Sequence, residues 1–165
     1  MSMLFADAGH LDESLVLRIQ LADYFRANGD LNNLQGCLGN QGLILYSRGD
    51  LDGAITLCKE QERICRELGN KNGLQGCLGN QGVILKARGD LDGAMTLYKE
   101  KERICRELGN VSGLAYSLIN QALALSQKGY ARESLLLAKE AYRLASNHGY
   151  AALAQQIEPI LQSLR

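Results

Sequence analysis

The sequence has 165 residues, of which 46% are hydrophobic, 5% aromatic and 22% charged. Its 18 basic residues balance 18 acidic ones, so no global field would attract nucleic acid or an anionic membrane surface. No apolar run approaches the roughly 18–20 residues that span a bilayer, and the first residues lack a signal-peptide pattern. We therefore expect no nucleic-acid partner and no membrane association. Few aromatic residues and a single proline favour packed helices over a sheet.

An internal repeat organises the chain. Residues 34–73 and 74–113 align without a gap at a period of 40 residues and differ at only eight positions. A period of this length is typical of solenoids, whose small units stack because none can bury its apolar face alone. We predict one repeat domain over 1–165, made of a partial unit 1–33, full units 34–73, 74–113 and 114–153, and a C-terminal capping helix 154–165.

The chain begins within a unit. Residues 1–8 align with only the tail of a unit's first helix, so the helix expected from His10 to Asn28 lacks its full partner. An apolar face runs along that helix through Leu11, Leu15, Ile19 and Ala22. We therefore expect the chain either to be a fragment of a longer array or to complete itself as a homo-oligomer through its exposed terminal helices.

Each full unit reads as two helices. The first, helix A, is expected from Asp30 to Arg48, and Gly49 is placed to end it in the left-handed conformation. Asp50 then offers an N-cap for helix B, which runs from Leu51 to Leu68. The same punctuation recurs at Gly89-Asp90 and Gly109-Asn110. Because the connections are only about two residues long, neighbouring helices must be antiparallel.

At the C-terminal end, Pro159 lies inside the last predicted helical stretch, 150–164, and is expected to kink or fray it. Two helices of about 18 residues and two short turns fill the 40-residue period and leave no room for a strand. We predict an all-α fold, an α-solenoid of antiparallel helix pairs with about eight helices.

The turn residues of these units also carry a family resemblance. Gly42, Gly49-Asp50 and Ala54 keep the offsets of tetratricopeptide repeats, and Gly82, Gly89-Asp90 and Ala94 repeat them. The chain resembles that family, and its 40-residue period resembles the subclass of kinesin light chains and Pins-type adaptors. The resemblance implies a right-handed superhelix. HEAT-type helical repeats, which have a similar length, are the alternative.

Three glutamines depart from the family pattern. Gln41, Gln81 and Gln121 stand where the family usually has a leucine packed between helices. A buried amide needs hydrogen-bond partners, so we expect these side chains to bond to a neighbouring helix or to reach the groove.

Catalytic and metal-binding patterns are lacking in the sequence. It contains no nucleophile elbow, no metalloprotease motif and no phosphate-binding glycine loop. We expect no enzyme activity, no cofactor and no metal site. The five cysteines are interpreted as small buried hydrophobic residues: Cys37, Cys58, Cys65, Cys77 and Cys105. Their odd number in a long chain indicates a reducing, cytoplasmic setting.

The family resemblance implies that the A helices line a concave groove that holds an extended or helical peptide. The predicted groove residues are Asn40, Leu43, Tyr46, Ser47, Asn80, Val83, Lys86, Tyr116, Asn120, Leu123 and Gln127. Asn40, Asn80 and Asn120 form a ladder whose amides could pair with a peptide backbone, or could cap or bridge adjacent helices instead. The pairs 43/83, 46/86 and 47/87 are among the eight differences, so they could tune peptide choice.

Two functions follow as expectations. The first is a protein–protein interaction module that binds a partner peptide or helix in the groove. The alternative is a structural or self-assembling array, or a spacer or sensor arm of a larger protein.

Overall fold

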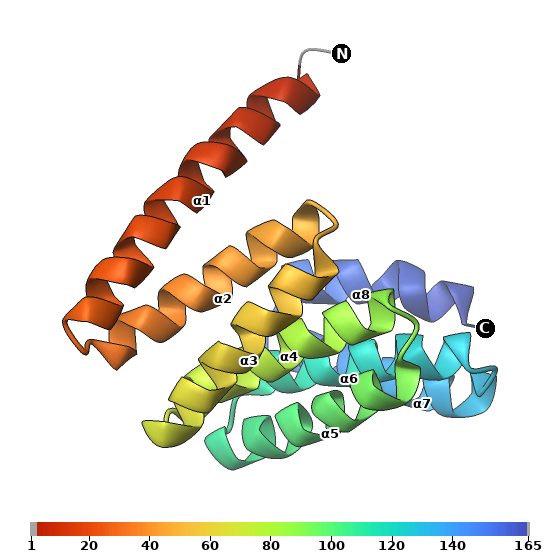
Figure 1. Cartoon of the computed structure of the whole chain (residues 1–165). Coiled ribbons are helices and arrows are strands. Elements are labelled where there is room, and N and C mark those ends of the chain that lie inside the picture. Colours follow the sequence, from red (N-terminus) through yellow and green to blue (C-terminus); the bar gives the residue numbers. More distant parts are fainter. Residues whose placement is uncertain (1–2, 165) are drawn as a thin grey trace. The chain divides into compact units, whose positions relative to one another are not determined.

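The computed structural model describes the backbone of residues 3–164 and the side chains of residues 13–164. Within these residues the chain folds into eight α-helices and no strand (Figure 1). The helices are α1 (Met3–Ala27), α2 (Leu31–Ser47), α3 (Leu51–Glu67), α4 (Lys71–Ala87), α5 (Leu91–Leu108), α6 (Val111–Gln127), α7 (Ala131–Asn147) and α8 (Ala151–Ser163). The predicted all-α solenoid of helix pairs is confirmed.

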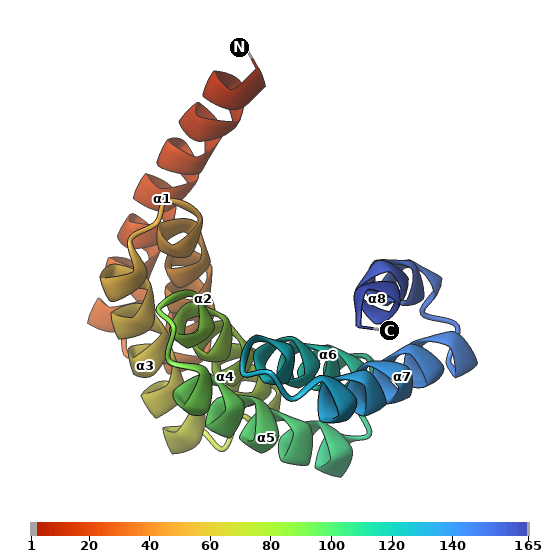
Figure 2. The same cartoon turned by 90° about the vertical axis from the view of Figure 1, so that its right-hand side faces the viewer.

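The helices fall into two compact units, residues 1–80 and 81–165. The first unit contains α1, α2, α3 and the first part of α4. The second contains the rest of α4 and α5 to α8, which Figure 2 shows from the side. The helix bounds show where each turn lies, but not at which residue one repeat unit ends and the next begins. The unit boundaries expected at residues 34, 74, 114 and 154 therefore stay a prediction.

Every turn between helices contains a glycine with a positive φ angle. These glycines recur every 20 residues, with φ between 63° and 85°, at Gly29, Gly49, Gly69, Gly89, Gly109, Gly129 and Gly149. A side chain with a Cβ atom would be strained in this left-handed conformation. The prediction that Gly49 ends a helix in this way is confirmed. Because each 40-residue repeat contains two helices and two turns, a turn glycine recurs every 20 residues.

Side-chain caps start most of the helices. The oxygens of Asp50, Asp90 and Asn110 each accept a hydrogen bond at 2.9 Å from the backbone N–H three residues later. Asp30 and Asn70 cap α2 and α4 in the same way. In the described chain, Tyr130 and Tyr150 take the corresponding positions before α7 and α8 without a side-chain cap. Each cap contributes about 1 kcal/mol of helix stability.

The N-terminal end of the chain differs from the sequence-based expectation. The repeat predicts that residues 1–8 are the tail of a separate helix, but α1 is one helix of 25 residues that continues through Gly9. At the other end, Pro159 lies inside α8, which continues to Ser163. The kink or fraying expected at this proline stays a prediction. Pro159 is exposed, so water can satisfy the carbonyl group that its missing N–H leaves open.

The core of the first unit joins α1, α2 and α3. Ala22, Leu34, Cys37, Leu38 and Ile64 form its buried cluster. Gly42 lets α2 approach α3 closely, since a Cβ at this glycine would lie 3.0 Å from the Cys58 sulfur.

The second unit packs small residues between its helices. Ala115, Ala122, Ala138, Ala141 and Ala145 are each fully buried, so α6 and α7 approach closely. α8 adds Leu153, Ile157 and Leu161 to the same core. The apolar side of α8 is therefore used up by packing within its own unit.

Two of the three buried glutamines bond to a neighbouring helix, as expected. Gln41, Gln81 and Gln121 are each 5% exposed or less. Gln41 Nε2 donates to the carbonyl oxygen of Arg18 on α1 at 2.8 Å, and Gln121 Nε2 donates to Glu102 on α5 at 2.7 Å. The amides of Gln41 and Gln121 thus join their A helices to the preceding B helix, which a leucine could not do.

Candidate functional site

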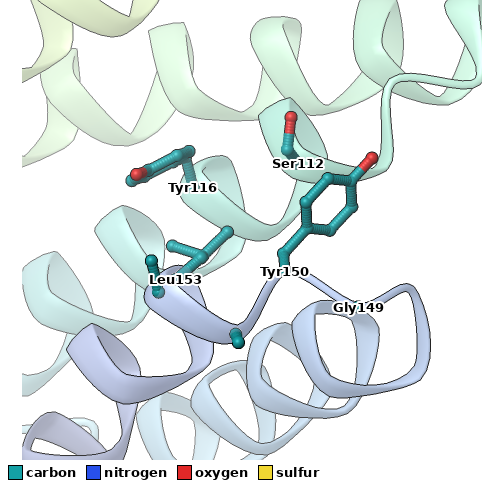
Figure 3. Close-up of a pocket in the computed structure, with 7 residues that line it drawn as sticks. Ser112, Tyr116, Gly149, Tyr150 and Leu153 are labelled. Carbon is teal, nitrogen blue, oxygen red and sulfur yellow. The ribbon is translucent and has the colours of Figure 1, made fainter.

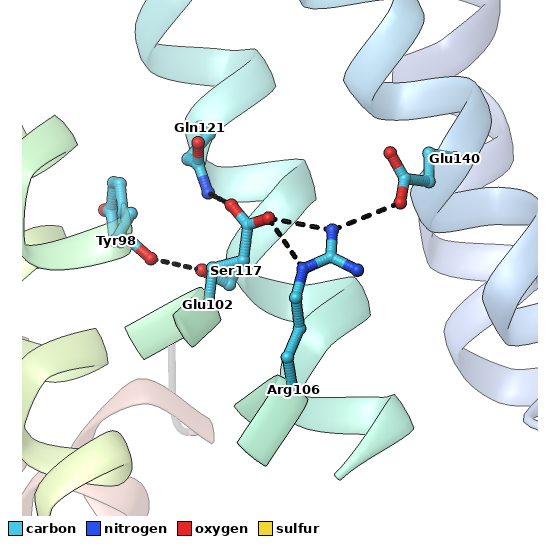
Figure 4. Close-up of polar contacts among 6 residues, drawn as sticks. All are labelled: Tyr98, Glu102, Arg106, Ser117, Gln121 and Glu140. Carbon is cyan, nitrogen blue, oxygen red and sulfur yellow. Dashed lines mark hydrogen bonds and ion pairs between the residues drawn. The ribbon is translucent and has the colours of Figure 1, made fainter. Parts of the chain in front are cut away.

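A polar network holds α6 in place between α5 and α7 (Figure 4). The Glu102 carboxylate accepts bonds from Gln121 Nε2 and from Arg106 Nε and Nη2, the last at 2.8 Å. Arg106 Nη2 also lies 3.4 Å from Glu140 Oε1 on α7. The hydrogen bond to Glu102 raises the pKa of the Arg106 guanidinium, which stays charged at any physiological pH. This network therefore links α6 to α5, and α5 to α7, by polar side-chain contacts.

Backbone oxygens complete this support. Ser117 Oγ donates to the Tyr98 carbonyl oxygen at 2.6 Å, and Ser134 Oγ on α7 donates to the Ala122 carbonyl oxygen at 2.7 Å. Both serines are fully buried. These two bonds join α6 to its neighbours α5 and α7.

The asparagine ladder is the most informative part of the predicted site. Asn40 is exposed, and Asn80 and Asn120 are half-buried. None of the three amides makes a hydrogen bond with any described residue, so they neither cap nor bridge helices there. Each stands directly before a buried glutamine. Within one dipeptide the glutamine faces the core, whereas the asparagine keeps its donors and acceptor open to solvent.

The α2 residues share a solvent-facing side. Leu43 is 46% exposed, Ser47 is exposed and Tyr46 is half-buried. Ser47 Oγ donates to the Ile44 carbonyl oxygen at 2.8 Å, so its hydroxyl is engaged by its own helix. Asn40, Leu43 and Tyr46 remain as residues that a ligand could touch.

The α4 residues are divided between the two units. Asn80 ends the first unit, and Val83 and Lys86 belong to the second. Val83 and Lys86 are both half-buried. Burial lowers the pKa of the Lys86 amine, because the charged form loses part of its hydration. A carboxylate from a ligand would offset that loss.

Of the predicted site residues on α6, Tyr116 lies beside a hollow of about 470 Å³ (Figure 3). Tyr116, 43% exposed, lines it together with Ser112 of the same helix. Tyr150 and Leu153 close it from the start of α8. Asn120 and Leu123 are half-buried and Gln127 is exposed further along α6. The lining is mostly apolar, and the Ser112 hydroxyl beside it donates to Asn110 Oδ1 at 3.1 Å.

Sequence reasoning missed Tyr150 and Leu153. The sequence predicts only a capping role for the C-terminal stretch, which assigns no residue there to the site. A signal was present, because Tyr150 precedes α8 where aspartate or asparagine precedes the earlier A helices.

The cysteines are not candidate nucleophiles. All five are free and buried, as predicted. Burial raises the pKa of Cys58 to about 11, and desolvation also raises the pKa of Cys65, Cys77 and Cys105. The reactive thiolate is therefore scarce at neutral pH. Among the described residues no group of three or more metal-ligating side chains comes together.

None of the described helices combines the length and the apolar character that crossing a bilayer requires.

Comparison with known proteins shows the fold alone. No protein-family model matches the sequence, and no curated protein matches it. Among solved structures the chain is similar to BtubC (BKLC) from P. vanneervenii, with a TM-score of 0.60 and 17% identity over 94% of this chain and 73% of that chain. That neighbour has tetratricopeptide-like helical repeats. The kinesin-light-chain or Pins-type subclass stays an expectation. The chain therefore has the fold of a tetratricopeptide-like helical repeat protein.

Proposed function

We propose that this chain is a protein–protein interaction module and not an enzyme. It binds an extended or helical peptide of a partner protein along the outer faces of its A helices. The observation that carries the proposal is the contrast within the Asn-Gln pairs: buried glutamines join the helices, and accessible asparagines make no bond within the described chain. An amide that both donates and accepts can pair with a peptide backbone whatever its sequence. Helical repeat proteins commonly serve as such scaffolds.

The other site residues indicate which side chains the peptide ligand should carry. The hollow beside Tyr116 and Tyr150 suits one apolar side chain of the peptide, since its lining is mostly apolar. The half-buried Lys86 amine favours an acidic side chain of the peptide, because a carboxylate would offset the hydration that the charged amine loses on burial. In the second unit the expected ligand thus combines an apolar anchor with a carboxylate.

A peptide selection on the full-length chain tests this proposal. A displayed random library is selected against the protein, and the affinity of the best peptide is then measured for variants. Asn120→Ala is expected to weaken binding about 3–10-fold, the value of one or two lost hydrogen bonds. The control is Asn147→Ala, which removes the same amide from an exposed position on the B helix α7. Equal affinity of both variants and the wild type would refute the site on α6.

A second substitution tests the charge preference. Lys86→Glu is expected to weaken a peptide that carries a carboxylate and to leave a neutral analogue unchanged. The double variant Asn80→Ala/Lys86→Glu tests the predicted site residues of α4 independently of those of α6. Unchanged binding by that double variant would remove α4 from the site.

We also propose a cytoplasmic location, on the strength of five buried cysteines that are all free. A structural or self-assembling role is the second candidate function. It is favoured by the exposed apolar residues of α1, with Val16 and Leu17 each 56% exposed.

A further inference from the structure

One buried polar atom of the first unit has no hydrogen-bond partner among the described residues. Gln61 on α3 is 7% exposed, and its side-chain oxygen Oε1 accepts no hydrogen bond there. The nitrogen of the same amide, Nε2, donates to Gln35 Oε1 on α2 at 3.3 Å. A buried acceptor without a donor destabilises a fold, so native proteins contain few of them. The glutamine at this position therefore needs an explanation other than packing.

The Gln61 amide lies against a glycine of α2. A Cβ atom at Gly39 would stand 2.7 Å from Nε2 and 2.8 Å from Oε1, so any larger residue would displace the amide. Asn40 follows directly and is exposed on the face of α2 where the peptide site is proposed. A side chain of the B helix thus reaches the backbone of the A helix one residue before Asn40.

A second glycine leaves space beside this amide. Gly36 lies one turn before Gly39 and Asn40, so the three residues are neighbours on the surface of α2. A Cβ atom at Gly36 would meet nothing within 4 Å, and its φ angle is not positive. Neither a close neighbour nor a turn requires this glycine, although glycine weakens a helix relative to alanine. A ligand that approaches the α2 backbone here would explain it.

The other polar atoms around Oε1 are already bonded. Cys65 Sγ donates to Gln35 Oε1 at 3.4 Å. Gln35 Nε2 donates to the carbonyl oxygen of Asn32 on its own helix at 3.2 Å. The Gln61 amide cannot simply turn over, because its oxygen would then face the oxygen of Gln35. Gln61 Oε1 is therefore the one atom of this cluster that lacks a partner.

The charges nearby favour a neutral donor. Glu60 and Glu62, the sequence neighbours of Gln61, are each paired with an arginine, Arg26 and Arg66. A cationic group would lose its hydration beside Gln61 without gaining one of these carboxylates. A carboxamide carries a neutral N–H donor and is slender enough to pass over two glycines.

The next repeat changes the polarity at this position. Residues 34–73 and 74–113 differ at eight positions, and at one of them Lys101 replaces Gln61. Lys101 is half-buried, and its amine makes no hydrogen bond or ion pair with a described residue. Burial lowers the pKa of this amine, because the charged form loses hydration. Two nearly identical repeats thus carry an unpaired acceptor and an unpaired donor at one position, which favours a role in selecting the ligand.

We propose that Gln61 is a specificity-determining residue of the peptide site on α2. Its Oε1 accepts a hydrogen bond from a side-chain carboxamide of the peptide, an asparagine or glutamine, that enters over Gly36 and Gly39. The Gln61 amide ends a flexible side chain, and no Cβ atom of residues 36 and 39 stands between it and the ligand. This role rests on the proposed function, since it requires a peptide on the face that carries Asn40.

The test uses peptides from the displayed library that bind the full-length chain and lose affinity when Asn40 is replaced by alanine. These peptides should contain an asparagine or glutamine whose exchange for the acid of the same shape weakens binding about 10-fold, since two acceptors would then meet. If no peptide responds to Asn40→Ala, the site on α2 fails and this role fails with it. If peptides respond but contain no such carboxamide, only the role of Gln61 is overturned.

Gln61→Met distinguishes this role from a structural one. The variant removes the unpaired oxygen, so the melting temperature of the free chain should rise by about 2–4 °C while the peptide affinity falls about 10-fold. Gln35 Oε1 keeps the Cys65 donor in this variant. In the matched control Gln41→Met, a buried glutamine loses its bond to the Arg18 carbonyl oxygen. That change should lower the melting temperature and leave the affinity unchanged. A Gln61→Met chain that melts below the wild type, or that binds the peptide equally well, would overturn the proposal.

Gln61→Lys copies the residue of the next repeat and should invert the preference. Selection on this variant should yield aspartate or glutamate where the wild type selects a carboxamide, because the lysine amine donates and attracts a carboxylate. An unchanged residue preference at that peptide position would count against Gln61 as the selecting residue.

Discussion

Gly82 tests the packing argument most directly. The first two full repeats are nearly identical, yet Gly42 of the first faces Cys58 and Gly82 of the second faces Tyr98. A Cβ at Gly82 would lie 2.8 Å from Cδ1 and 2.9 Å from Cζ of the Tyr98 ring, closer than real Cβ atoms approach their neighbours. Tyr98 is fully buried, so the ring cannot swing into solvent.

The expected magnitude combines two opposing effects. Replacing a helical glycine by alanine stabilises a helix by up to about 1 kcal/mol. Overpacking a closed core costs about 1–3 kcal/mol. Gly82→Ala should therefore lower the free energy of unfolding by about 1 kcal/mol, which lowers the melting temperature by about 2–4 °C in a chain of this size.

The same helix supplies the control. A Cβ at Gly76 would meet no atom within 4 Å, so Gly76→Ala should stabilise the protein by up to about 1 kcal/mol. Urea unfolding followed by circular dichroism measures both changes. Combining Gly82→Ala with Tyr98→Cys recreates the smaller neighbour of the first repeat, and the double variant should be more stable than the two single effects predict. A Gly82→Ala protein as stable as Gly76→Ala would refute the reasoning.

Three other predictions concern stability. Gln121→Ala should cost about 2 kcal/mol, because a charged acceptor loses its donor, whereas Gln127→Ala, exposed on the same helix, should stay within about 0.5 kcal/mol of wild type in urea unfolding. Asn110→Ala should cost about 1 kcal/mol by removing a cap, and Tyr130→Asn should recover a similar amount by adding one, as thermal melts of both variants would show. The free energy of unfolding should also fall as the pH rises above about 8.5. Thiols of the unfolded chain lose their protons there, whereas burial raises the pKa of Cys58 in the folded chain to about 11. A Cys58→Ala variant whose urea midpoint has the same pH dependence would contradict this.

The helix boundaries could be predicted from the sequence because they depend on local chemistry. A glycine accepts a left-handed backbone wherever it stands, and an adjacent aspartate or asparagine caps the next helix by accepting from a backbone N–H three residues later. The predicted helices 30–48 and 51–68 therefore agree with α2 and α3 within about two residues at each end. The same rules were insufficient at Gly9, where α1 continues without a turn.

Of the candidate site, too, one part could be predicted from the sequence and another part could not. The position of Asn120 on an accessible face could be predicted, since it follows from helical spacing along α6. A bond from Gln121 to a neighbouring helix was one of two expected outcomes, but its partner Glu102 could not be predicted. Nor could the lack of a partner for the Asn120 amide among the described residues, because both amides have the same chemistry and only the neighbouring helix distinguishes them. The hollow between Tyr116 and Tyr150 was missed for the same reason, since its two sides come from α6 and α8.

By itself, then, the sequence determined the helices, their turns and the repeat that stacks them, all of which depend on residues close together in the chain. Only the tertiary structure decided which faces are covered. Leu21 and Gln61 occupy equivalent positions in the repeat, yet the leucine is exposed and the glutamine is buried. Burial depends on which helix packs alongside, and no local pattern contains that information.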